Sequence, residues 1–134
     1  MPVTHLEHYL VVSEVLEQTK DFYCSVLGLT EGFRPELGFD GYWLYTGDIP
    51  CLHLADRESY REYKARVGTP VPKQTADTGA IDHIAFNAVG FDATVSRLEA
   101  EGLDYRRNDI PDIGLRQLFV QDPNAVTLEL NFRE

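Results

Sequence analysis

Two short stretches of this chain are nearly alike and decide its fold: LEHYLVV at residues 6–12 and IDHIAF at residues 81–86. Each is an apolar run typical of a β-strand, with an acidic residue and then a histidine near its start. The two histidines, His8 and His83, are 75 residues apart. An internal repeat of this kind predicts two copies of one structural unit.

The repeat continues beyond the histidines. Residues 16–27 and 91–101 each have the pattern of an amphipathic helix that ends at a glycine, and these glycines, Gly28 and Gly102, are 74 residues apart. Further on, LHL at residues 52–54 matches LEL at residues 128–130 with an offset of 76. Such steady offsets indicate a duplicated unit with small changes in its loops.

Strand, helix and turn signals give both copies the order βαβββ. In the first copy we expect a helix at about 15–27, capped by Ser13, and strands at residues 6–12, 30–34, 42–45 and 51–55. In the second copy we expect a helix capped by Asp92 that ends near Glu101, and strands at residues 81–88, 105–107, 115–120 and 126–132. The predicted fold class is α+β, with two βαβββ modules.

The predicted organisation is a single domain with a first module at 4–55, a connector at 56–79 and a second module at 80–134. Residues 58–66 of the connector favour a short exposed helix, and Gly68, Pro70 and Pro72 break the chain after it. The 134 residues, with 43% hydrophobic and 25% charged residues, are enough for a packed core.

Composition excludes several classes of function. A net charge of −10 lacks the positive footprint of a nucleic-acid-binding protein. No apolar run approaches the length of a membrane span, and the N-terminus lacks a signal-peptide pattern, so we expect a cytoplasmic protein without a membrane partner. Two cysteines are too few for a disulfide scaffold.

Alternation along the strands brings polar groups to one face. In the last strand Leu128 and Leu130 share the face opposite Glu129, and in the fourth strand Leu52 and Leu54 share the face opposite His53. The strands that contain His8 and His83 are apolar on both faces and are expected to be covered on both sides. Covered imidazoles and carboxylates require a partner.

A single divalent cation could be the partner of all four repeat-related side chains, His8, His53, His83 and Glu129. Imidazole nitrogen and carboxylate oxygen suit zinc, iron, nickel or manganese. Taken singly, each residue is more often structural, but their equivalent positions favour a metal site. His5 has no counterpart in the second copy and is interpreted as an accessory or surface residue.

The chain resembles the vicinal oxygen chelate superfamily, which includes glyoxalase I, methylmalonyl-CoA epimerase, type I extradiol dioxygenases, fosfomycin resistance enzymes and bleomycin-binding proteins. The resemblance covers almost the whole chain outside the connector. It is carried by the two opening stretches and by three further segments: FYCSVLGL at residues 22–29, FVQDPN at residues 119–124 and LEL at residues 128–130.

The resemblance implies two modules whose curled mixed sheets surround a metal cleft, with ligands from the first and last strands of each module. By position these are His8, His53, His83 and Glu129. Of these, His8, His83 and Glu129 match the two-histidine, one-carboxylate set of the dioxygenase and fosfomycin branches. His53 stands where glyoxalase I-like members carry an acidic or amide ligand. Small members usually dimerise, so the resemblance also implies a homodimer in which one cleft takes residues from both chains.

The activity expected first is glyoxalase I-like lyase or isomerase chemistry on a small oxygenated substrate, with Glu129 as the base and His53 as a ligand or second proton carrier. The alternatives are a catechol-cleaving extradiol dioxygenase that uses Fe(II), and a non-catalytic small-molecule or antibiotic-binding protein. Five residues are candidates for substrate binding or acid–base assistance: Tyr42, Trp43, Tyr45, Arg116 and Phe119.

Overall fold

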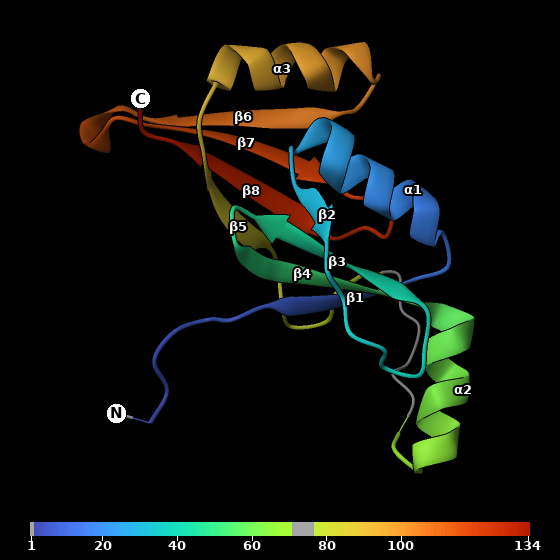
Figure 1. Cartoon of the computed structure of the whole chain (residues 1–134). Helices are drawn as coiled ribbons and strands as arrows, with labels where there is room; N and C mark the ends of the chain where they lie inside the picture. Colours follow the sequence, from blue (N-terminus) through green and yellow to red (C-terminus); the bar gives the residue numbers. More distant parts are fainter. Residues whose placement is uncertain (1, 71–76) are drawn as a thin grey trace. The chain divides into compact units, whose positions relative to one another are not determined.

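The computed structural model describes residues 2–70 and 77–134. The chain divides into two compact units, residues 1–73 and 74–134, with the boundary inside the expected connector. Each unit contains four strands in one mixed sheet and a helix after the first strand (Figure 1). This confirms the α+β class and the duplicated βαβββ order.

The first unit forms a sheet with the strand order β1-β4-β3-β2, in which β1 is parallel to β4 and the other pairs are antiparallel. Its strands are β1 (Tyr9–Ser13), β2 (Thr30–Gly32), β3 (Gly41–Thr46) and β4 (Ile49–Asp56). Helix α1 (Leu16–Asp21) continues into a π-helical turn, η1 (Phe22–Val26), and α1 contacts β3 and β4. Gly28, with a φ of 79°, follows this helix as expected.

Ser13 is not the N-cap of α1. Val15 holds that position without a side-chain cap, while the Ser13 hydroxyl accepts from the Val15 amide at 2.9 Å and bonds the Thr19 hydroxyl at 3.0 Å. Ser13 is fully buried at the end of β1, so its hydroxyl joins the strand to the helix instead of starting the helix.

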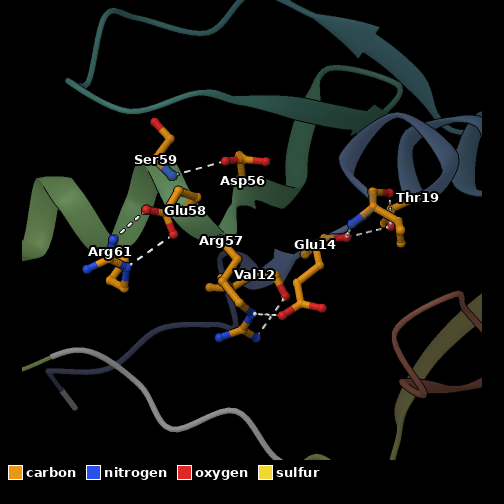
Figure 2. Close-up of polar contacts among 10 residues, drawn as sticks. Val12, Glu14, Thr19, Asp56, Arg57, Glu58, Ser59 and Arg61 are labelled. Carbon is orange, nitrogen blue, oxygen red and sulfur yellow. Dashed lines mark hydrogen bonds and ion pairs between the residues drawn. The ribbon is translucent and has the colours of Figure 1, made fainter.

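The exposed helix expected in the connector is α2 (Arg57–Val67), and none of its residues is buried. The Asp56 carboxylate accepts from the Ser59 amide at 3.0 Å, which caps its first turn. The Arg57 guanidinium donates to the Val12 carbonyl at 3.5 Å and pairs with Glu14 at 3.8 Å, which ties α2 to the end of β1 (Figure 2). Pro72, an expected break, lies outside the described residues.

The second unit repeats this topology in its sheet order, β5-β8-β7-β6. Its elements are β5 (Ile84–Ala88), α3 (Phe91–Ala100), β6 (Tyr105–Ile110), the 3-10 turn η2 (Pro111–Ile113), β7 (Leu115–Gln121) and β8 (Thr127–Phe132). Helix α3 lies along this sheet (Figure 1), and its Phe91 ring packs edge-on against Phe132 at 5.3 Å.

Asp92 is not the cap of α3. The cap position is Gly90, with a φ of 80°, and Asp92 lies inside the first turn. The Glu134 carboxylate accepts from the Gly90 and Phe91 amides at 2.6 and 2.9 Å. A distant carboxylate therefore takes the role that sequence proximity assigned to Asp92.

Leucines that alternate along the strands form the core of each unit. Leu52, Leu54, Leu128 and Leu130 are at most 4% exposed, as the strand pattern predicts. The expectation that the first strands begin near Leu6 and Ile81, covered on both sides, is wrong. Those residues are 80% and 59% exposed, and the ladders with β4 and β8 begin only at Tyr9 and Ile84. None of the helices in the described ranges is long and apolar enough to cross a membrane.

Candidate functional site

The strand register places the candidate ligands at equivalent points of the two units. His8 and His83 directly precede β1 and β5. His53 lies opposite Leu10 in β1 and Trp43 in β3, and Glu129 lies opposite Ala85 in β5 and Phe119 in β7. Each unit therefore holds a histidine, a ligand-type residue on its fourth strand and an aromatic ring on its third.

In the first unit three rings form a stack. The His53 imidazole lies between His8, at 3.7 Å and 15°, and Trp43, at 4.1 Å and 8°. The Glu7 carboxylate lies 2.9 Å from His8 Nδ1 and fixes the orientation of that ring. The stack holds both imidazoles side by side.

His53 is kept neutral by its surroundings. Burial, followed by the charge of His8, lowers the pKa of the His53 imidazole. Its Nε2 atom is buried and has no hydrogen-bond partner among the residues that the structure describes. A buried polar atom without a partner is uncommon, and a neutral imidazole nitrogen is a metal ligand, so His53 fits a metal centre.

In the second unit His83 contacts two carboxylates. Its Nδ1 lies 2.8 Å from Asp82 Oδ2, and its Nε2 lies 3.4 Å from Glu129 Oε1. The hydrogen bond with Asp82 is the main cause that raises the pKa of His83, and the charge of Glu129 adds to it. His8 and His83 therefore each bond the acidic residue that precedes them in the sequence. The sequence analysis did not assign this role to Glu7 or Asp82.

A ladder of side-chain amides orients Glu129. Asn108 donates to Gln117 at 2.8 Å, Gln117 donates to Asn131 at 3.0 Å, and Asn131 donates to Glu129 Oε2 at 2.8 Å. Gln117 and Asn131 are buried. Asn131 thus occupies one oxygen of Glu129 and leaves Oε1 facing His83. The sequence analysis missed this ladder, although Asn131 and Glu129 are two residues apart and therefore lie on the same face of β8.

A cavity of about 720 Å³ opens beside this pair within the second unit. The side chains that matter for its chemistry are Asp82, His83, Asp104, Arg106, Phe119 and Glu129. The Phe119 ring stands edge-on to His83 at 6.4 Å, and the Arg106 guanidinium lies over the Phe119 ring, 4.3 Å from its centroid.

Three other residues that the sequence analysis assigned to substrate contact are not among the residues that line this cavity, and they make other contacts. The Tyr42 hydroxyl donates to Glu17 of α1, and Tyr42 shares the face of the buried Leu44. Arg116 stacks over Phe91 of α3 at 4.2 Å, and the Tyr45 hydroxyl donates to the Phe33 carbonyl at 2.6 Å. Substrate roles for these three residues stay predictions.

Each unit thus holds one pair of ligand-type residues, His8 with His53 and His83 with Glu129. Within the described ranges, 2–70 and 77–134, no three His, Cys, Asp or Glu side chains converge as a metal site. The four-residue set His8, His53, His83 and Glu129 therefore stays a prediction.

Replacing Asn131 by leucine removes both hydrogen bonds of a buried amide and leaves Gln117 without its acceptor. We expect this to lower the free energy of unfolding by about 1–3 kcal/mol, the usual cost of an unsatisfied buried group. Urea denaturation measures the change. Asn108→Ala, at the exposed end of the ladder, is the matched control and should cost clearly less. Equal losses in the two variants would contradict the ladder.

Replacing Asp82 by asparagine removes the main cause of the raised His83 pKa, so the pKa should fall. Proton NMR titration of the chelator-treated protein follows the imidazole directly. A raised pKa favours the folded state below the unfolded value of about 6.5, and that stabilisation is lost as pH rises through the folded pKa. The variant should lose most of this pH dependence and keep the part that the Glu129 charge supplies. An unchanged His83 titration would show that Asp82 does not hold the proton there.

Known proteins resemble this chain over most of its length. The family model for the Glyoxalase/Bleomycin resistance protein/Dioxygenase superfamily matches residues 5–130. A relative from Arabidopsis thaliana, named Glyoxylase I 4, is 30% identical over 131 residues, which are 96% of this chain and 70% of the relative.

Solved structures that share the fold include a lyase and a binding protein. A lactoylglutathione lyase from Agrobacterium tumefaciens has a TM-score of 0.68 at 20% identity, covering 98% of this chain and 95% of the other. TnmS3, an antibiotic binding protein from Streptomyces sp. CB03234, has a TM-score of 0.68 at 19% identity, covering 100% and 99%. The resemblance inferred from the sequence is confirmed, and the chain belongs to the Glyoxalase/Bleomycin resistance protein/Dioxygenase superfamily.

Proposed function

We propose that this protein is a divalent-metal-dependent enzyme that acts on a small oxygenated molecule by glyoxalase I-like lyase or isomerase chemistry. The observation that carries the proposal is the buried Nε2 of His53, which has no partner among the described residues and belongs to a neutral imidazole stacked on His8. The equivalent pair of the second unit, His83 and Glu129, supplies the carboxylate.

In this proposal one cation is held by His8, His53, His83 and Glu129. These ligands come either from a single chain or from the two chains of a homodimer. When bound, the metal polarises substrate oxygens and stabilises negative charge that develops on them. Glu129 is the candidate base: Asn131 occupies its Oε2, and its Oε1, which lies 3.4 Å from His83 Nε2, is the oxygen that would accept a proton from carbon. His53, neutral and shielded by Trp43, serves as a ligand or carries a second proton.

Lyase or isomerase chemistry ranks first because the relative at 30% identity is named Glyoxylase I 4. Fe(II)-dependent cleavage of a catechol is the second candidate, and two imidazoles with one carboxylate, His8, His83 and Glu129, favour it. A non-catalytic binding protein is the third candidate, supported by the fold shared with TnmS3 and by the aromatic stack at Trp43.

Metal binding tests the proposal directly. Titration of the chelator-treated protein with Zn²⁺, Ni²⁺, Mn²⁺ or Fe²⁺ against a chromophoric chelator should give a stoichiometric site. Glu129→Gln and His83→Gln should each weaken it at least as much as the roughly 10–100-fold typical of losing an outer-shell partner. His5→Gln, a histidine outside both pairs, is the control and should bind normally. A protein that binds no metal, or variants that bind equally well, would exclude a metal enzyme.

The metal-loaded protein then separates the candidate reactions. Exchange of a substrate carbon-bound proton with solvent deuterium, without oxygen uptake, supports lyase or isomerase chemistry. Oxygen consumption with catechols and Fe²⁺ would place ring cleavage first. Tight binding of substrate-like molecules without turnover would favour the binding protein.

A further inference from the structure

We propose that the cavity of the second unit recognises a single carboxylate group through Arg106, so that its ligand is a small oxygenated monocarboxylate with a flat body that lies beside Phe119. This deepens the proposed function, because the ligand would be the substrate of that enzyme. The carboxylate subsite itself rests only on residues of the second unit.

Arg106 pairs with no carboxylate of residues 2–70 or 77–134. It lines the cavity with its guanidinium over Phe119, and it forms no ion pair or hydrogen bond within the described part of the chain. Its neighbour Arg107, on the opposite face of β6, is satisfied by both oxygens of Asp109, each at 2.9 Å. The strand thus presents one neutralised arginine and one free arginine, and the free one faces the cavity.

The fold does not require an arginine at this position. Arg106 pairs with Phe119, and the equivalent residue of the first unit, paired with Trp43, is Gly32. A Cβ at Gly32 would lie 2.7 Å from the Tyr45 ring, so a side chain at this position of the first unit would require the Tyr45 ring to move. The same framework therefore accommodates glycine in one copy and a cavity-facing cation in the other.

The charges around Arg106 limit the kind of anion. A guanidinium presents a planar fork of donors that matches a carboxylate. Asp82, Asp104 and Glu129 line the same cavity, and the chain carries 22 acidic against 12 basic residues. These carboxylates repel a multiply charged ligand such as a phosphate ester more strongly than a monoanion, so a monoanion is the ligand that the Arg106 charge can best balance.

The order of groups along the cavity sets the size of the ligand. On adjacent strands Arg106 pairs with Phe119 and Phe119 pairs with Glu129. The Phe119 centroid lies 4.3 Å from the Arg106 guanidinium and 6.4 Å from the His83 ring centroid. A molecule about as long as one aromatic ring, with its carboxylate on Arg106, would bring other oxygens to the His83–Glu129 pair. The cavity of about 720 Å³ is within the range of small-molecule sites.

Salicylate and its uncharged analogue salicylamide test the subsite, because they share ring and hydroxyl and differ in the carboxylate. Binding to the full-length, chelator-treated protein is measured by NMR, including the Nε–H signals of the arginines. We expect salicylate to bind more tightly than salicylamide and to shift the Arg106 signal. Arg106→Gln should weaken salicylate binding by roughly tenfold, as expected for a charge-assisted hydrogen bond, and leave salicylamide unchanged.

Arg107→Gln, on the same strand but the opposite face, is the matched control and should bind both molecules normally. Arg106→Lys keeps the charge without the fork, and an intermediate affinity for salicylate would support the bidentate contact. Equal binding of the two molecules, no binding of either, or an Arg106→Gln variant that still prefers salicylate would overturn the subsite. Since no metal is present, salicylate binding by a protein that never takes up metal would refute the enzyme proposal and leave the subsite standing.

Discussion

The parallel pairing between the first and fourth strands of each unit is the constraint on which the rest of the structure depends. It brings residues more than 40 positions apart into register, Leu10 with His53 and Ala85 with Glu129. The histidine that precedes each first strand then lies beside the ligand-type residue of the fourth. A slip of one residue in either ladder would turn His53 or Glu129 toward the leucine core, so the same hydrophobic pattern that builds the core also positions these side chains.

The sequence could predict most of the fold because its signals are periodic and repeated. Alternating leucines and steady offsets between the copies are local patterns, and they hold in the structure. Helix caps were harder, because capping is decided by whichever acceptor reaches the free amides. The Ser13 hydroxyl forms a hydrogen bond with the Thr19 hydroxyl. The Glu134 carboxylate, 42 residues from Asp92 in the sequence, caps α3. No sequence pattern next to Ser13 or Asp92 indicates that Thr19 or Glu134 would take part in these contacts.

The sequence could predict those candidate site residues that occupy equivalent positions in the two copies. It could not predict contacts that depend on how neighbouring strands pair. His8, His53, His83 and Glu129 are visible because the two copies can be aligned. Asn131, Gln117 and Asn108 become a ladder only when β6, β7 and β8 are placed side by side. The inward direction of Tyr42 did have a signal, since it is two residues from Leu44 and therefore shares its core-facing side.

Duplication has given the two units different electrostatic characters on one framework. In the first unit, burial and a neighbouring imidazole favour the neutral form of His53, and its aromatic neighbour packs flat against it. In the second unit, two carboxylates favour the protonated form of His83, and a chain of amides fixes Glu129. A neutral nitrogen is suited to donating a lone pair, whereas an oriented carboxylate is suited to exchanging a proton. The division follows from what surrounds each pair, because the backbone positions that hold them are the same.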